Sequence, residues 1–195
     1  MINFAGAREK IEVLSNKEKG RLMLKYAMNY GVVLGAFWVF KYMFFMGSVS
    51  FRGTYLYFSD TLLYISLYLM PIITLSLSYV LVKRFRDNVL GGSINYVQCV
   101  IFGTLLFFFA ALLEAALIYI HYKFLVDPQY MITRDKSWLE IALQRLFSRE
   151  WLDAQKETYG TIIILISEIV KNVMIGFFLS SIYGIFVRTR TNVKP

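Results

Sequence analysis

The sequence predicts an all-α integral membrane protein, a four-helix transmembrane bundle with an amphipathic interfacial helix in its third loop. Hydrophobic residues make up 57% of the 195-residue chain, whereas soluble domains average about 45–50%. Four apolar runs each reach the roughly 20 residues that a helix needs to cross a hydrocarbon core, and most charged residues lie between them. We therefore interpret residues 1–195 as a single membrane domain.

The four predicted spans are continuous apolar runs, without the alternation that marks β-barrel strands. Because lipid offers the backbone no hydrogen-bond partner, runs of this length must be helical. The runs cover residues 22–47, 57–82, 96–122 and 161–187. No signal-peptide core precedes the first run, so we expect it to remain in the membrane as an anchor.

The first two spans each carry a local signal. Gly31 and Gly35 have the Gly-x-x-x-Gly spacing that lets a second helix approach closely. Pro71 lies near the middle of the second span, where its missing amide donor predicts a kink.

The distribution of charge predicts the orientation of the spans. Eleven Lys and Arg residues lie in the two tails and in the turn between the second and third spans, and seven lie in the other two loops. The positive-inside rule therefore puts the N and C termini in the cytoplasm. The long third loop, residues 123–159, then lies on the outer side.

This outer loop has the pattern of a helix. Ser137 and Glu140 have the spacing of a capping box, and apolar residues recur every three or four positions after them. We expect an interfacial helix on the outer membrane surface, with the apolar anchors Trp138, Leu143, Phe147 and Trp151. The same pattern also fits a helix that covers the loop ends of the bundle, or one that binds a partner protein.

The fourth span carries a stripe of polar and small residues at intervals of four. The stripe consists of Glu168, Asn172, Gly176, Ser180 and Gly184. Small residues allow a second helix to approach closely. That second helix can belong to the same bundle or to a separate subunit, and the sequence leaves both readings open.

Four ionisable residues lie inside the predicted spans: Lys41, Glu114, Glu168 and Lys171. Each costs about 2.5–3.5 kcal/mol at the centre of a membrane helix. All four fall in the predicted outer half, so we expect a net-neutral cluster of paired acids and bases, with Asn172 beside it. This cluster is either an ion-pair lock that orients the helices or a binding site for a headgroup, an ion or a peptide. Snorkelling to the interface is a further reading for Lys41.

The residue inventory excludes several classes of site. One histidine, His121, and one cysteine, Cys99, cannot form bis-histidine haem, multi-histidine zinc or histidine–cysteine clusters. No nucleophile elbow or phosphate-binding glycine loop occurs, and the basic residues lack interleaved stacking aromatics. We therefore expect no metal, no cofactor, no nucleic-acid partner and no enzymatic activity. An enzyme on lipid-linked substrates, using Asp60, Glu114 or Glu168, is a minor alternative.

The layout also resembles a known family. The features that carry the resemblance are Lys25-Tyr26, Tyr30-Gly31 and Gly35 at the start of the first span, the basic second turn, Glu114, and the charged loop before the fourth span. With them the chain is similar to a bacterial family of unknown function, common in the Bacteroides lineage, of four-span inner-membrane proteins. The resemblance implies a multi-pass protein of the bacterial inner (cytoplasmic) membrane. It also implies an association with a polyprenyl-phosphate glycosyltransferase or other envelope machinery, and it carries over no catalytic residues.

Two functions fit these observations. Our leading expectation is a non-catalytic accessory or scaffold subunit of an inner-membrane complex, because catalytic groups are lacking while two helix faces suit close packing. The alternative is a small oligomeric transporter or lipid-handling protein that uses the Lys/Glu cluster. The expected partners are membrane lipids, together with either another membrane subunit or a second copy of the chain.

Overall fold

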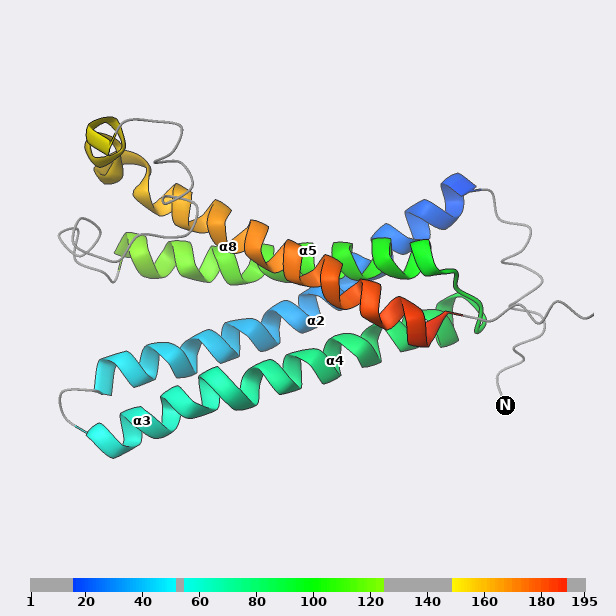
Figure 1. The fold of residues 1–195 in the computed structure, drawn as a ribbon, viewed down its shortest axis with the longest axis horizontal. Coiled ribbons are helices and arrows are strands. Elements are labelled where there is room, and N and C mark those ends of the chain that lie inside the picture. Colours follow the sequence, from blue (N-terminus) through cyan, green and yellow to red (C-terminus); the bar gives the residue numbers. More distant parts are fainter. Residues whose placement is uncertain (1–15, 52–54, 125–148, 189–195) are drawn as a thin grey trace, which may run out of the picture.

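The computed structural model of the chain describes residues 16–51, 55–124 and 149–188, and the side chains of 18–48, 55–124 and 161–188. Across these residues the protein is helical and contains no strand, which confirms the all-α prediction (Figure 1). The helices are α2 (Asn16–Phe51), α3 (Leu56–Tyr64), α4 (Met70–Arg84), α5 (Tyr96–Phe124) and α8 (Arg149–Val187), with π-helical turns η1 (Ile65–Leu69) and η2 (Phe85–Val89) before and after α4.

Four helical segments are long and apolar enough to cross a membrane. They are Glu18–Ser48, Leu56–Val89, Tyr96–Phe124 and Thr161–Val187. Each exceeds the roughly 20 residues that a hydrocarbon core requires, and the second is built from α3, η1, α4 and η2 in sequence. The chain is therefore a multi-pass membrane protein with a four-helix bundle, as predicted.

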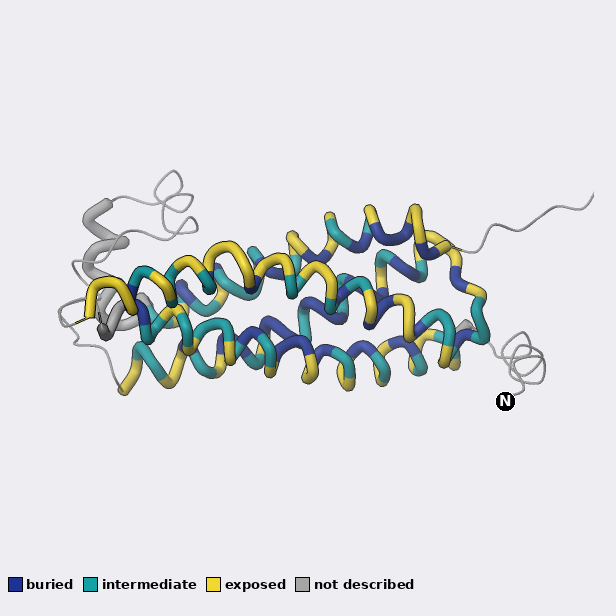
Figure 2. The backbone as a smooth tube through the Cα atoms, turned by 90° about the horizontal axis from the view of Figure 1, so that it is seen from below, coloured by how far each residue is buried: buried dark blue, intermediate teal, exposed yellow. Residues whose placement is uncertain are grey.

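Helix α5 lies at the centre of the bundle. It packs extensively against α2 on one side and α8 on the other, and half of its most apolar window is buried, against 22–28% for the other three spans. Figure 2 shows buried positions along the inner faces of the helices and exposed positions on their outer faces. At the core, the rings of Phe85 and Phe102 stack with centroids 3.8 Å apart. A face rich in exposed apolar side chains is what lipid contact requires.

The small residues predicted to bring helices together all face α5. A Cβ atom at Gly31 would lie 2.5 Å from the Cβ of Phe109, and one at Gly35 would lie 2.8 Å from a methyl group of Leu113. On α8, Gly176 lies against Phe107, Ser180 against Gly103, and Gly184 against Tyr96. Both small-residue faces are therefore occupied within the chain.

Pro71 is accommodated by the π-helical turn η1. Because proline has no N–H and its ring clashes with the preceding turn, a regular α-helix cannot continue through it. The turn widens instead, and the N–H of Met70 donates to the carbonyl of Ile65, five residues back. The expected disturbance at Pro71 takes the form of this wider turn.

One end of the bundle carries the first turn of α2, the η2–α5 connection and the last turn of α8 (Figure 1). We call it the basic end, because Lys19, Arg21, Lys83, Arg84 and Arg86 lie there. Arg86 Nη1 donates to the Val187 carbonyl at 3.0 Å, so a cation caps the C-terminus of α8. The tight turn between η2 and α5 uses Gly91 and Gly92 at φ of 60° and 85°, a region that favours glycine.

The predicted interfacial helix falls largely outside the described residues. Its anchors Trp138, Leu143 and Phe147 lie outside them, as does the side chain of Trp151. The backbone of Trp151 belongs to α8, which begins at Arg149 and continues into the fourth span. The described part of the predicted 123–159 loop is therefore a helical extension of the fourth span, and α5 reaches Phe124 at the other side of the loop.

Candidate functional site

A carboxylate on the central helix ties three helices together. Lys41 Nζ on α2 lies 3.0 Å from Glu114 Oε1 on α5, and Asn172 Nδ2 on α8 donates to Glu114 Oε2 at 2.9 Å. Both oxygens of this carboxylate are therefore bound, and its side chain is only 6% exposed. A buried carboxylate with a cation and an amide donor satisfies the requirement that charges in a membrane be paired.

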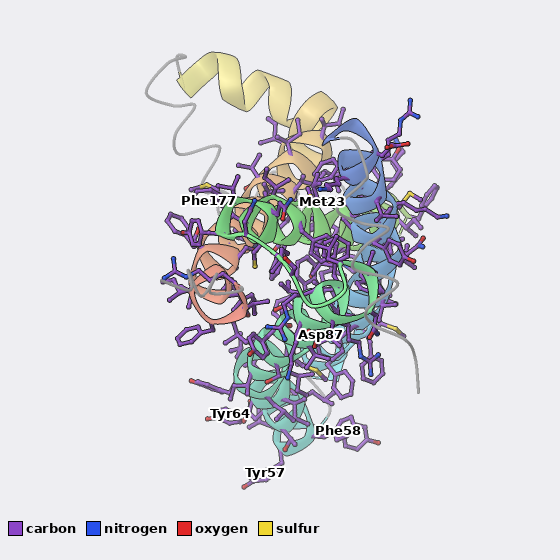
Figure 3. All side chains as sticks on the ribbon, turned by 90° about the vertical axis from the view of Figure 1, so that its right-hand side faces the viewer. Met23, Tyr57, Phe58, Tyr64, Asp87 and Phe177 are labelled. Carbon is purple, nitrogen blue, oxygen red and sulfur yellow. The ribbon has the colours of Figure 1, made fainter. Side chains whose placement is uncertain are left out.

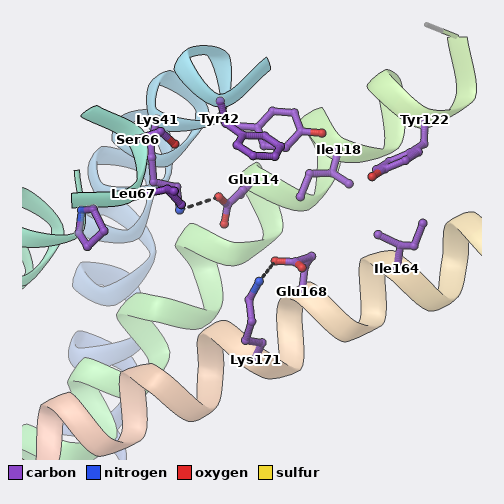
Figure 4. Close-up of a pocket in the computed structure, with 12 residues that line it drawn as sticks. Lys41, Tyr42, Ser66, Leu67, Glu114, Ile118, Tyr122, Ile164, Glu168 and Lys171 are labelled. Carbon is purple, nitrogen blue, oxygen red and sulfur yellow. Dashed lines mark hydrogen bonds and ion pairs between the residues drawn. The ribbon is translucent and has the colours of Figure 1, made fainter. Parts of the chain in front are cut away.

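A second ion pair lies on α8 alone. Lys171 donates to Glu168 from one helical turn away (Figure 4). These side chains are more open than the first pair, with 43% of Lys171 and 29% of Glu168 exposed. Because both members belong to one helix, this pair does not join α8 to another helix.

The two pairs share one cavity of about 430 Å³ between α2, η1, α5 and α8. Figure 4 shows both pairs facing this space, with Ser66 and Leu67 of η1 drawn beside Lys41 and away from Glu168 and Lys171. Its charged lining residues are Lys41, Glu114, Glu168 and Lys171, and Ser66 and Pro71 also line it. A cavity of this volume suits a small-molecule group, and the wall contributed by α4 touches α8 at few positions.

A second cavity of about 290 Å³ shares four charged residues with the first and adds Trp38 and Asn172. Trp38 is buried, and its ring centroid lies 5.4 Å from Lys41 Nζ, within the range of a cation–π contact. Among the described residues, its indole Nε1 has no hydrogen-bond partner. A buried N–H without a hydrogen-bond partner is uncommon in folded proteins.

The structure thus brings together the five residues of the predicted polar cluster. Lys41, Glu114, Glu168, Lys171 and Asn172 all line the smaller cavity. The small residues of the two predicted packing faces lie elsewhere, against α5, and no described group of three or more His, Cys, Asp or Glu residues could hold a metal ion.

Sequence reasoning missed Trp38, Ser66 and the cavity-lining role of Pro71. Trp38 precedes Lys41 by three positions, so both lie on one face of α2, and that spacing could have placed it in the cluster. Ser66 could not have been found in this way, because its place in the cavity wall depends on the π-helical turn before Pro71.

The cluster contains equal numbers of acidic and basic groups. Each described carboxylate in it accepts from a lysine, and Glu114 accepts from Asn172 as well. The more exposed pair, Glu168 and Lys171, can exchange its mutual contact for contacts with the opposite charges of a ligand.

These features define a multi-pass membrane bundle with a polar cavity inside its transmembrane region. The chain belongs to the family described as Protein of unknown function (DUF4199), whose model matches residues 29–189. The match includes all five residues of the polar cluster and confirms membership of a family of unknown function. No curated protein and no solved structure matches the chain.

Proposed function

We propose that the chain is a lipid-handling protein of the bacterial inner membrane, without catalytic activity of its own. It holds the polar group of a membrane amphiphile at the cluster formed by Lys41, Glu114, Glu168 and Lys171. The observation that carries the proposal is the cavity of about 430 Å³ lined by both ion pairs within the transmembrane region. Intramembrane ionisable residues that face a cavity commonly mark a substrate site.

The arrangement of the second pair supports binding over a purely structural lock. A lock must join different helices, as the contacts of Glu114 with Lys41 and Asn172 do. Glu168 and Lys171 both lie on α8 and remain partly exposed toward the cavity. The free energy that these two charges lose on leaving water is therefore not offset by a contact that joins two helices.

The basic end supports an orientation in which both termini lie in the cytoplasm. With both termini in the cytoplasm, the cluster falls in the outer half of the membrane, because Lys41 lies about 10 Å along α2 from Ser48 at the opposite end. A cysteine placed at Arg188 in a Cys99→Ser background should resist a membrane-impermeant maleimide added to intact cells. Rapid labelling from outside would contradict this orientation.

The function is tested by the lipids that the purified protein keeps. The full chain should retain lipid through washing in a mild detergent, and native mass spectrometry should detect it as a bound species. A Glu168→Gln/Lys171→Gln variant, which removes both charges and keeps polar side chains at both positions, should retain several-fold less. Equal retention by the two proteins, at equal thermal stability, would contradict a lipid site at this cluster.

A second candidate is an accessory or scaffold subunit of an inner-membrane complex. It is favoured by the outer face of α3 and η1, where exposed aromatic side chains project away from the bundle, among them Tyr57, Phe58 and Tyr64 in Figure 3. Tyr64 also stacks on Tyr68, with ring centroids 5.9 Å apart. Such a face suits either the membrane interface or a partner helix.

Purification separates these two functions. An accessory subunit should copurify with a stoichiometric membrane partner from gentle detergent extracts. The Tyr64→Ser/Tyr68→Ser double variant should no longer copurify with that partner. A chain that purifies alone at native expression levels would contradict the accessory role and leave the lipid-handling proposal in place.

A further inference from the structure

Lys171 lies where polar and apolar cavities meet. It lines the two cavities described above and a third pocket of about 440 Å³, open at the surface of α8, whose other lining residues are the apolar and exposed Met174, Ile175 and Phe178. One side chain therefore borders both a charged chamber and an apolar surface within the transmembrane region. A ligand that fills both must have a polar head and an apolar tail.

The apolar part continues as a crevice between α4 and α8. Leu75 of α4 and Ile175 and Leu179 of α8 line the smaller cavity, and Lys171 and Leu179 are about 12 Å apart along the helix. Toward the basic end the two helices are joined by Tyr183, whose hydroxyl donates to the Leu75 carbonyl at 3.0 Å and lies 3.0 Å from Ser78 Oγ. The crevice is thus charged at one end and closed by a hydrogen-bonded tyrosine at the other.

The charge of the cluster indicates the charge of the headgroup. Two ammonium groups and two carboxylates give the cluster a formal charge of zero. An anionic headgroup would add an unbalanced charge in a poorly solvated site, which is costly. A zwitterionic headgroup keeps the site neutral, because its phosphate can pair with Lys171 while its cation pairs with Glu168.

The walls of the cavity favour a primary amine as that cation. A primary ammonium has three N–H donors, and the cavity offers the Glu168 carboxylate and Ser66 as acceptors.

We propose, as a refinement that rests on the lipid-handling function, that the ligand is a phospholipid with a zwitterionic phosphate–primary amine headgroup, phosphatidylethanolamine in chemical terms. Its headgroup lies between Lys171 and Glu168, and one acyl chain lies in the crevice along Leu75, Ile175 and Leu179. The lipid reaches the site sideways, between α4 and α8.

Competition among lipids tests the headgroup. The delipidated full chain in detergent is offered equal amounts of phosphatidylethanolamine, phosphatidylcholine and phosphatidylglycerol with the same acyl chains, and bound lipid is measured by native mass spectrometry. The ethanolamine lipid should exceed the other two by about tenfold, since a charged hydrogen bond contributes enough free energy for such a ratio. Lys171→Gln and Glu168→Gln should each reduce this preference.

The crevice is tested with a matched pair of variants on α8. Ile175→Trp fills the crevice and should reduce binding of all three lipids several-fold, while the charged cluster is unchanged. Ile182→Trp adds the same bulk at an exposed position that lines none of the three cavities and should bind like the original protein. Thermal unfolding of each variant shows whether it is folded.

The outcomes distinguish this inference from the function on which it rests. Preference for phosphatidylglycerol would contradict the proposal that the headgroup is zwitterionic. Preference for phosphatidylcholine would contradict the proposal that its cation is a primary amine, and would indicate that aromatic side chains in the cavity bind the cation. In both cases the proposed lipid-handling function would stand. Lipid retention that is equal in the original protein, Lys171→Gln, Glu168→Gln and Ile175→Trp would overturn both.

Discussion

Asn172 on α8 donates a hydrogen bond to the Glu114 carboxylate on α5 at 2.9 Å, across 58 positions of sequence. The other oxygen of the same carboxylate faces Lys41 of α2 at 3.0 Å. Glu114 therefore holds the inner wall of the cavity in place, and the more exposed Glu168 and Lys171 remain for a ligand. Substitution of Glu114 should therefore affect mainly stability, and substitution of Glu168 or Lys171 mainly binding.

Replacing Glu114 by Gln should destabilise the bundle, because Lys41 would lose its partner inside the membrane. Lys41 is 27% exposed and can reach toward the opening, so we expect a loss of about 1–3 kcal/mol, below the usual cost of breaking a fully buried pair. Thermal unfolding in detergent measures the loss. In the Lys41→Met/Glu114→Gln double variant the loss should be smaller than the sum of the single effects; simple additivity would show that the two side chains are not coupled.

Replacing Gly103 by Ala should weaken the contact between α5 and α8. The new Cβ would overlap Ser180 of the facing helix, and packed interiors tolerate such overlap poorly, at about 1–3 kcal/mol. Gly20→Ala is the matched control, because a Cβ there meets nothing within 4 Å; it should stabilise α2 by up to about 1 kcal/mol. Similar melting temperatures for the two variants would contradict the close crossing.

Arg86 should stabilise the end of α8. Loss of its hydrogen bond to the Val187 carbonyl in Arg86→Met should cost about 1 kcal/mol and speed amide hydrogen exchange in the last turn of α8. Arg84→Met removes the same charge from an exposed position and should leave that exchange unchanged. Equal acceleration in both would indicate an effect of net charge instead of this bond.

Pro71 should matter more for the cavity than for stability. Pro71→Ala restores an amide donor, so η1 should convert to regular α-helix and rotate Ser66 and Leu67 within the cavity wall. We expect lower lipid retention at equal or higher thermal stability, with new amide protection in the 65–71 segment. If the variant binds lipid as well as the original protein does, the π-helical turn is not needed for lipid binding.

Much of the fold could be predicted because a membrane allows few solutions. A long apolar run must be helical where no water can bind the backbone, and the four spans follow from that rule. The i,i+3 relation of Glu168 and Lys171 follows from helical spacing in the same way. The sequence did not indicate which of the two acids pairs with Lys41, or which helix the small residues face. A glycine face fits any neighbouring helix, and only the folded bundle shows that α5 lies at the centre.

Two features depended on details that a sequence pattern does not contain. Pro71 predicts a disturbed helix, yet whether the chain kinks or widens into a π-helical turn depends on how neighbouring helices pack. The orphan N–H of Trp38 appears only when every described partner around it is known. For this reason the cluster of charged residues could be predicted from the sequence, but the cavity could not.

The central claim is that a lipid lies in the crevice between α4 and α8 with its headgroup at Lys171. The most direct measurement is photo-crosslinking of the full chain in membranes with a phosphatidylethanolamine that carries a diazirine in its acyl chain, followed by mass-spectrometric mapping of the adducts. If the lipid lies there, the adducts should be concentrated on Leu75, Ile175 and Leu179. Adducts that simply follow exposure to lipid, strongest at open positions such as Phe186 and absent from the crevice, would contradict it.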